Sequence, residues 1–376
     1  MGRIEDLPVR SDLRGLSPYG APQFDVAVQL NTNENPFAPP PEVVAEVAAA
    51  VADAAVHLNR YPDREAVALR ADLATYLTRT TGVDLTSDDV WAANGSNEIL
   101  QQVLQAFGGP DRTALGFEPS YSMHPILARG TGTQWLTSPR NADLGLDAVG
   151  VVSAIKSQDP DVVFLTSPNN PTGAAIPLSV IAAAYDATRG IVVVDEAYAE
   201  FTSAPSAITL LSQRPRLLVV RTMSKAFALA GARVGYIAAA PEVISALQLV
   251  RLPYHLSSIT QAAARAALAH TDALLGTVDE VKAQRDRIVE SLLGMGLEVA
   301  GSDANFVLFG TFTDSRLVWQ HLLDRGVLIR DVGIAGMLRV TAGTSDETTA
   351  FLTALSDTMR DHPELVRTQP SSEETS

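Results

Sequence analysis

The feature that most constrains this chain is an alternation, between about residues 65 and 270, of short β-branched runs with Ala- and Leu-rich stretches of helical length. DVVFLTS (161–167), IVVVDEAYAEF (191–201) and RLLVVRTMS (216–224) are such runs, and LSVIAAAYDAT (178–188) is one of the helical stretches. This alternation predicts an α/β fold with a mostly parallel sheet flanked by helices. Ligands of such sheets bind beyond the carboxyl ends of the strands, so functional side chains should follow each strand.

The ends of the chain predict a second, smaller α+β domain. A long charged helix is expected over 277–293, and short strands at NFVLFG (305–310), GVLIRDV (326–332) and LRVTAG (338–343). We expect four parts along the chain: an N-terminal segment with part of the small domain over 1–50, the large cofactor-binding domain over 51–272, the C-terminal small domain over 273–365, and a disordered polar tail over 366–376.

Composition argues against several classes of function. The sequence has no cysteine, which excludes disulfides, iron–sulfur clusters and thiolate-bound zinc, and no pair of its six histidines has metal-ligand spacing. A net charge of −15 without a basic stripe argues against nucleic-acid binding. The sequence contains neither an apolar signal segment nor a run approaching the roughly 18 apolar residues of a membrane span. We therefore expect a cytoplasmic protein without a metal or a membrane partner.

The segment RTMSKAFALAGAR (221–233) follows a predicted strand and contains Lys225, one of three lysines among 28 basic residues. Arg and Lys serve about equally well on a surface, but only Lys can lose its proton and form an imine with an aldehyde. A single lysine is usually a surface charge, so the residues predicted to lie near Lys225 must show whether it binds a cofactor. The position predicts a lysine that holds an aldehyde cofactor such as pyridoxal phosphate.

Such a cofactor needs an anion at its pyridine nitrogen and donors near its phenolate oxygen. Asp195 ends the apolar run IVVVD, where a lone carboxylate is costly unless a cation pairs with it. Tyr198 and Asn170 could donate to the phenolate oxygen, and the Tyr121 ring could stack on the pyridine. Taken alone, an Asp in this position more often caps a helix or pairs with an arginine, and an Asn before a proline is more often a turn residue.

A phosphate group needs a cradle of donors. NGSNE (94–98) lies at a predicted helix N-terminus, where free N–H groups and the helix dipole attract anions, although a capping turn explains it equally well. The candidate phosphate ligands are Gly95, Ser96, Asn97, Thr222, Ser224 and Arg233.

Seven motifs, in order over nearly the whole chain, resemble those of fold-type I pyridoxal-phosphate aminotransferases, and most closely the histidinol-phosphate aminotransferases. They are NTNENP, RYPD, NGSNE, SPNNPTG, VVVDEAYAEF, SKAFALAGARVGY and LRVTAGT. The resemblance implies pyridoxal 5′-phosphate as cofactor, with an amino group exchanged between histidinol phosphate and 2-oxoglutarate to give imidazole-acetol phosphate and glutamate, or the reverse. It also implies a cis peptide bond before Pro171.

The resemblance implies the same roles for these residues. Lys225 would hold the cofactor covalently, Asp195 would face its pyridine nitrogen, and Asn170 and Tyr198 its phenolate oxygen. Tyr61, in RYPD, would reach the cofactor phosphate of a neighbouring subunit, which implies a homodimer with shared active sites.

Substrate binding is implied for residues from both ends of the chain. Arg339, in LRVTAGT, would bind a substrate carboxylate through two parallel hydrogen bonds, and Arg330 would provide a second anion receptor. Read without the family, Arg330 is a strand-edge surface charge. The imidazole side would be lined by Tyr19, Asn33, Glu34 and Tyr254.

Three alternatives remain open on the sequence. An aromatic amino-acid aminotransferase acting on phenylalanine or tyrosine would share the fold and the cofactor, and its substrate has no second anion for Arg330. A pyridoxal-phosphate lyase would share the fold and cleave a different bond. A non-catalytic ligand sensor would bind the cofactor without transferring an amino group, but no DNA-binding segment accompanies this chain.

Overall fold

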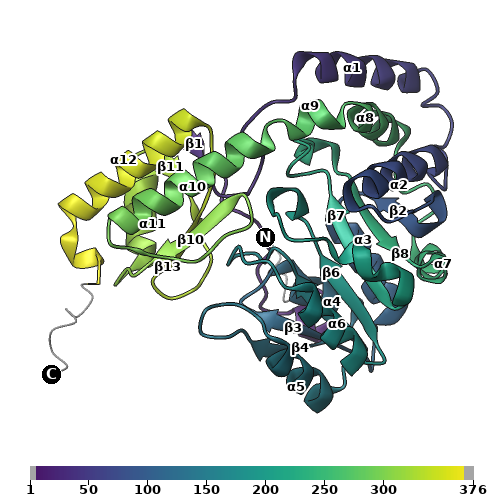
Figure 1. Ribbon diagram of the computed structural model, residues 1–376, viewed down its shortest axis with the longest axis horizontal. Coiled ribbons are helices and arrows are strands. Elements are labelled where there is room, and N and C mark those ends of the chain that lie inside the picture. The colour runs from purple at the N-terminus through teal and green to yellow at the C-terminus, as the bar shows by residue number, and fades with distance from the viewer. Residues whose placement is uncertain (1–5, 368–376) are drawn as a thin grey trace.

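The computed structural model describes residues 6–367, which form a large and a small lobe (Figure 1). The large lobe contains a seven-stranded sheet, counted within the described residues, with strand order β2-β8-β7-β6-β5-β3-β4. Adjacent strands are parallel from β4 to β7, and only β8 runs against its neighbours, so the predicted mostly parallel sheet is confirmed. The strands are β2 (Val90–Ala93), β3 (Thr113–Glu118), β4 (Gln134–Pro139), β5 (Val162–Thr166), β6 (Ile191–Asp195), β7 (Leu217–Thr222) and β8 (Gly235–Ala239).

Helices cover both faces of this sheet because its central strands are apolar on both sides. In β5, Val162 and Phe164 pack on one face while Val163 and Leu165 pack on the other. Helices α3, α4 and α7 contribute to the first layer, and α2, α5, α6 and α8 to the second. The helices of the large lobe are α1 (Pro41–Ala55), α2 (Val67–Thr81), α3 (Ser96–Phe107), α4 (Met123–Thr131), α5 (Ala148–Gln158), α6 (Leu178–Ala187), α7 (Pro241–Val250), α8 (Ser258–Ala269) and α9 (Thr271–Leu275).

The small lobe combines segments from both ends of the chain. Strand β1 (Val28–Gln29) pairs in parallel with β11 (Val327–Leu328), and a four-stranded antiparallel sheet has the order β12-β13-β10-β9. Its strands are β9 (Glu298–Val299), β10 (Phe306–Gly310), β12 (Arg330–Asp331) and β13 (Met337–Thr341), and its helices are α10 (Val278–Gly294), α11 (Ser315–Asp324) and α12 (Ser345–Asp361). Helix α10 runs from the large lobe into the small one (Figure 1).

One strand prediction in the small lobe needs correction. Residues 326–332 were expected to form one strand, but β11 and β12 are separate strands in different sheets, with the buried Ile329 between them. At this point the chain stops pairing with β1 and begins to pair with β13, where Arg330 lies opposite Arg339 in the antiparallel sheet.

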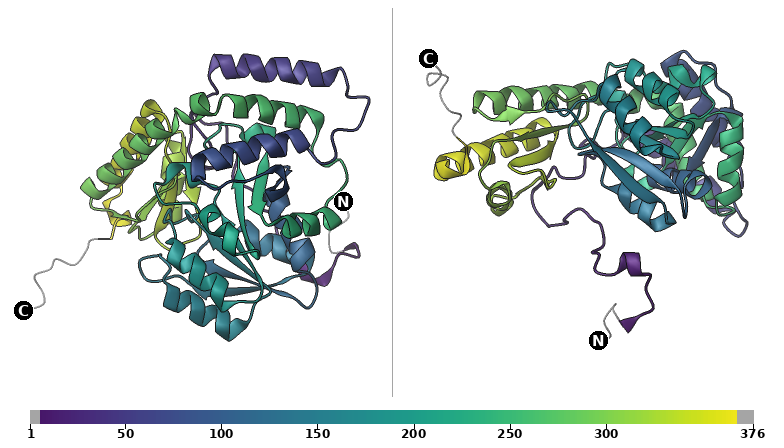
Figure 2. Two further views of the ribbon diagram at one scale, coloured as in Figure 1. Left: turned by 45° about the vertical axis from the view of Figure 1, so that its right-hand side comes forward. Right: turned by 90° about the horizontal axis from the view of Figure 1, so that it is seen from below.

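We propose the division of the chain into the four parts given above. The boundary at 50/51 falls inside α1, which lies alongside α8 in both views (Figures 1 and 2), and the boundary at 272/273 falls inside α9. At the start of the proposed tail, Val366 forms a β-bridge with Phe312, and the Arg367 N–H donates to the Thr311 carbonyl. The rest of the tail, 368–376, lies outside the described residues. In residues 6–367, no helix combines the length and apolar character needed to span a membrane.

Candidate active site

The carboxyl ends of β5, β6 and β7 open into a cavity of about 410 Å³ that is also lined by the small lobe and the N-terminal segment. Most of the predicted site residues meet there although they are spread over more than 300 positions of the chain. The predicted residues that line the cavity are Tyr19, Asn33, Glu34, Ser96, Asn97, Tyr121, Asn170, Asp195, Tyr198, Thr222, Ser224, Lys225, Arg233, Arg330 and Arg339.

Lys225 projects into this cavity from the loop after β7. Its Nζ donates a hydrogen bond of 2.9 Å to the Thr32 carbonyl. Burial, together with the nearby Arg339 and Arg233 charges, lowers the pKa of the Lys225 amine to about 8, while Glu34 acts in the opposite direction. An appreciable fraction of the amine is therefore neutral near physiological pH, which is the form that attacks a carbonyl carbon.

Asp195 is a buried carboxylate at the end of β6. Its Oδ2 lies 3.1 Å from His124 Nε2, and its Oδ1 accepts from the Ala197 N–H at 3.2 Å. His124 is itself buried against Phe164 and Trp135, with the Tyr121 ring edge-on to it. Sequence reasoning missed His124, because a histidine in the SYSMHP segment carries no motif signal and contacts Asp195 across 71 positions.

Tyr198 has a fully enclosed hydroxyl that receives two hydrogen bonds. Asn33 Nδ2 donates to Tyr198 Oη at 2.9 Å and Asn170 Nδ2 donates at 3.4 Å. Burial raises the pKa of the Tyr198 hydroxyl, which keeps the group protonated. The peptide bond between Asn170 and Pro171 is cis, as the resemblance implied.

Several donors converge at the N-terminus of α3. No side chain within the described residues caps this helix, and its N-cap residue Gly95 has φ of 84°. A Cβ atom at Gly95 would lie 2.7 Å from Arg233 Nη2, so glycine makes room for the guanidinium. Thr222 donates to Ser224 Oγ at 2.9 Å, and Arg233 Nη1 lies 3.5 Å from the same oxygen. This set of free N–H groups, hydroxyls and one guanidinium suits a phosphate.

The ring of Tyr121 lies beside this cradle. Its hydroxyl donates to Asn97 Oδ1 at 3.3 Å, and its ring edge meets His124 with the two planes at 89°. Tyr121 thus contacts both the first turn of α3 and the histidine that lies against Asp195.

Two arginines of the small lobe, Arg330 and Arg339, also line the cavity and provide positive charge there. Arg339 donates from Nη1 to Asn170 Oδ1 and from Nη2 to the Asn31 carbonyl, the latter at 2.8 Å. Arg339 Nε and Arg330 Nη1 are buried and have no hydrogen-bond partner among residues 6–367. Burial lowers the pKa of Arg339 to about 10, which still leaves it charged at neutral pH. Buried donors without partners are rare, and because these two belong to residues that line the cavity, a bound anion could pair with them.

Three predicted site residues do not line the cavity. Gly95 lies directly behind it at the start of α3. Tyr61 and Tyr254 stack on each other, with ring centroids 4.5 Å apart and planes at 17°, and their exposed fractions are 80% and 40%. Within one chain, neither tyrosine reaches the cofactor cradle or the two arginines.

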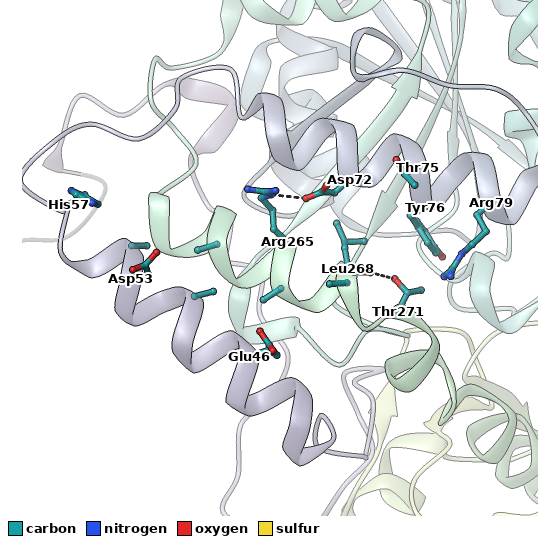
Figure 3. A pocket seen from close by; sticks show the side chains of 15 residues that line it. Glu46, Asp53, His57, Asp72, Thr75, Tyr76, Arg79, Arg265, Leu268 and Thr271 are labelled. Carbon is teal, nitrogen blue, oxygen red and sulfur yellow. Dashed lines mark hydrogen bonds and ion pairs between the residues drawn. The ribbon is translucent and has the colours of Figure 1, made fainter.

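Another groove, of about 710 Å³, lies between α1, α2 and α8 (Figure 3). Its two arginines are each paired with a carboxylate: Arg265 Nε meets Asp72 at 2.6 Å, and Arg79 meets Asp272 at 3.0 Å. It lacks the combination of an amine, a buried carboxylate and unpaired donors. We therefore place the candidate active site at the strand ends, on chemistry rather than on size.

The side chains that line this cavity fit pyridoxal phosphate. A phosphate cradle, a buried carboxylate, an amine with a lowered pKa and an aromatic ring lie in one cavity, and each meets a different requirement of that cofactor. In the described part of the chain, no cluster of side chains could hold a metal ion.

Comparison with known proteins agrees with this geometry. Residues 25–355 match the family model for aminotransferase class I and II. The chain belongs to the class I and II aminotransferases. It is 63% identical to a histidinol-phosphate aminotransferase of Frankia casuarinae (94% of this chain, 91% of the relative) and 62% identical to one of Mycolicibacterium smegmatis (93% of each).

A solved structure shares the fold. It is that of histidinol-phosphate aminotransferase from Sinorhizobium meliloti in complex with pyridoxal-5′-phosphate, with a TM-score of 0.80, 28% identity, and coverage of 89% of this chain and 92% of that one. The family and the fold-type I architecture expected from the motifs are both confirmed. The roles of the individual residues are proposed below.

Proposed function

We propose that this enzyme transfers an amino group between histidinol phosphate and 2-oxoglutarate, producing imidazole-acetol phosphate and glutamate or the reverse, as a step of histidine biosynthesis. The observation that carries this proposal is the pair of buried nitrogens without a hydrogen-bond partner, Arg330 Nη1 and Arg339 Nε, on two arginines that line the same cavity as the phosphate cradle. Relatives above 60% identity that bear the histidinol-phosphate aminotransferase name support the same substrate.

The substrates explain why the wall has two guanidinium groups. Histidinol phosphate brings a dianionic phosphate, and glutamate brings two carboxylates, so each substrate carries two negative charges. A planar guanidinium binds either group through parallel hydrogen bonds. Phenylalanine and tyrosine have a single carboxylate and would leave one of the two arginines without an anion, which disfavours the aromatic alternative.

Pyridoxal phosphate, when bound, supplies the aldehyde that accepts the amino group and the ring that withdraws electrons from the reacting carbon. Lys225 would hold the cofactor through its Nζ. Once the substrate's amine has displaced Lys225, the free Nζ would take the proton from the substrate's reacting carbon, a task suited to a pKa of about 8. Asp195, fixed by His124 and the Ala197 N–H, would place its carboxyl group in an enclosed position where the ring nitrogen of the cofactor needs a partner. Tyr198 donates its hydroxyl proton into the cavity.

We also propose that the active form is a homodimer, in which Tyr61 reaches the cofactor phosphate of the neighbouring subunit. Its exposed ring, stacked on that of Tyr254 and away from the cavity of its own chain, supports this reading. We place the reaction in the cytoplasm, since its substrates are intermediates and partners of amino-acid synthesis.

The test is a half-reaction followed through the absorbance of the bound cofactor. Histidinol phosphate and, separately, phenylalanine are added to the loaded enzyme without any amino acceptor. We expect histidinol phosphate to convert the cofactor to its amine form at far lower concentration than phenylalanine. Equal or better conversion by phenylalanine would overturn the substrate but keep the cofactor and Lys225. A protein without a cofactor band would overturn the whole proposal.

A further inference from the structure

Asn33 occupies a buried and conformationally unusual position in the N-terminal segment. Only 1% of the residue is exposed, and its φ of 56° lies in the left-handed region that few residues other than glycine adopt. An arrangement of this kind persists only where the surroundings hold it in place. The contacts of Asn33 show what those surroundings are.

Three contacts fix the Asn33 backbone and the orientation of its amide. Thr341 Oγ1 donates to Asn33 Oδ1 at 3.0 Å and lies 3.1 Å from the Asn33 N–H, which donates to it. Asn305 Nδ2 donates to the Asn33 carbonyl at 3.1 Å. Because Thr341 donates to the amide oxygen, the amide nitrogen is left to face the other way.

That nitrogen meets Tyr198. Asn33 Nδ2 donates to Tyr198 Oη at 2.9 Å, and Asn170 Nδ2 donates to the same oxygen at 3.4 Å. A tyrosine hydroxyl has one proton to donate and accepts through its lone pairs. With both acceptor directions filled by amides, the proton of Tyr198 has only the cavity side left to point toward.

We propose that Asn33 is a positioning residue, which acts through Tyr198 by directing the tyrosine hydroxyl proton into the cavity toward the cofactor. The sequence had suggested Asn33 as a group lining the imidazole side of the substrate. Its buried amide, turned to Tyr198 on one side and to Thr341 on the other, gives it this different task. Asn170 lies farther from the hydroxyl and also accepts from Arg339, so Asn33 makes the shorter of the two hydrogen bonds to Tyr198.

The inference rests on the cofactor proposed above and not on the identity of the substrate. A hydroxyl that donates to an anionic oxygen stabilises the deprotonated form of the acceptor. Loss of that donation should therefore raise the pH at which the bound cofactor changes its visible absorbance. Tyr198 is faced by Arg339, Asp195, Tyr19 and Tyr121, and the variants below leave all four unchanged.

The experiment is a spectrophotometric pH titration of the substrate-free, cofactor-loaded enzyme. Asn33→Gly removes the amide and tolerates the positive φ. We expect it to raise the midpoint by about one pH unit, a large part of the rise caused by Tyr198→Phe. In the Tyr198→Phe background, Asn33→Gly should produce no further rise, because the group through which it acts has gone.

Two further variants separate this role from a loosened loop. Thr341→Val keeps the shape of the side chain and removes the hydroxyl that orients the Asn33 amide, so it should raise the midpoint in the same direction by a smaller amount. Asn35→Ala removes an amide from the same loop that bonds to Ala226 and Thr277 rather than to Tyr198, and should leave the midpoint in place.

A wild-type midpoint in both Asn33→Gly and Thr341→Val would overturn the inference, and so would an equal rise with and without the Tyr198 hydroxyl. Either result would leave the proposed transamination intact. Absence of a cofactor band from the wild-type protein would instead overturn the proposed function, and this inference with it.

Discussion

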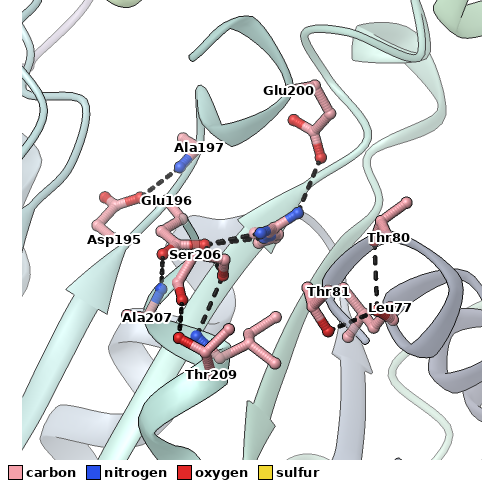
Figure 4. A network of polar contacts seen from close by, with 12 residues as sticks. Leu77, Thr80, Thr81, Asp195, Glu196, Ala197, Glu200, Ser206, Ala207 and Thr209 are labelled. Atoms are coloured by element: carbon pink, nitrogen blue, oxygen red, sulfur yellow. Dashed lines mark hydrogen bonds and ion pairs between the residues drawn. The ribbon is translucent and has the colours of Figure 1, made fainter. Parts of the chain in front are cut away.

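Polar side chains lie on two sides of the carboxyl edge of the large sheet. The two sides differ in how many of these polar groups find a hydrogen-bond or ion-pair partner within the chain. Asp195 and Thr222 line the active-site cavity, while the adjacent residues Glu196 and Arg221 line a separate cavity of about 450 Å³ behind it. Successive residues of an extended chain point to opposite sides, so one pair of strand ends supplies both. Figure 4 shows Asp195 turned away from the network that surrounds Glu196.

Behind the site, the buried charges are paired within the chain. Arg221 Nη2 meets Glu196 Oε2 at 2.8 Å, and Arg221 Nη1 meets Glu200 Oε1 at 3.3 Å. Burial raises the pKa of the Glu200 carboxyl. Burial by itself would lower the pKa of Arg221, but the nearby Glu196 and Glu200 carboxylates outweigh it, and the pKa of Arg221 is raised. Three further donors join the network: the Ala207 N–H and the Ser206 hydroxyl donate to Glu196, and the Tyr76 hydroxyl donates to Glu200.

In the active-site cavity, by contrast, Lys225 is held by one carbonyl and two arginine nitrogens are left without a partner among the described residues. The comparison separates polar groups that the fold consumes from groups that it leaves for a ligand. Substitutions on the first side should therefore cost stability, and those on the second should cost activity.

The largest effect is expected at Lys225. Lys225→Ala and Lys225→Arg should each lower the turnover number by about 10³-fold or more, since neither side chain can hold an aldehyde or move a proton near neutral pH. The measurement is steady-state transamination, with thermal unfolding as the control for folding. Wild-type turnover in either variant would remove Lys225 from the mechanism.

Arg221→Met tests the satisfied side. It leaves Glu196 and Glu200 buried without their cation, so the free energy of unfolding should fall by about 3–5 kcal/mol. Urea unfolding measures the change. The triple variant Glu196→Gln, Glu200→Gln and Arg221→Met removes all three charges together and should regain much of the loss. A single variant as stable as the wild type would show that the network carries little of the fold's stability.

Arg330→Leu tests the unsatisfied side. Loss of a charged donor to a phosphate should raise the KM for histidinol phosphate by roughly 10- to 100-fold with kcat little changed. Arg325→Leu is the matched control, because Arg325 lies in the same lobe but pairs with Asp361 at the surface. An unchanged KM in Arg330→Leu would mean that its unpartnered nitrogen binds no substrate anion.

The smallest effect concerns pH. Because the pKa of Lys225 is lowered to about 8 in the folded state, the unfolded chain binds one more proton than the folded chain between about pH 8 and 10.5. The stability of cofactor-free protein should then rise over this range by about 2.5 kcal/mol relative to Lys225→Met, which has no amine to titrate. Parallel unfolding curves for the two proteins across that range would show that the amine is not destabilised by burial.

The alternation of strands and helices was predictable because it repeats locally. The placement of Asp195 at the end of a strand, and of Asn170 and Lys225 in the loops after strands, was predictable for the same reason. What the sequence could not provide are contacts between distant segments. Thr32 accepts from Lys225 across 193 positions, and Asn33 meets Thr341 across 308. The sequence did not single out Glu196 and Arg221, for a related reason. They are neighbours of predicted site residues in the chain, and only the three-dimensional structure shows that their side chains point away from the active-site cavity.

A structure of the enzyme with pyridoxal phosphate and histidinol phosphate bound would test this contrast most directly. We predict that Arg330 Nη1 and Arg339 Nε gain hydrogen bonds to the substrate's negatively charged groups, while Arg221 keeps Glu196 and Glu200 as partners with no ligand nearby. Substrate phosphate bound away from both arginines, or at the Arg221 network, would contradict the account.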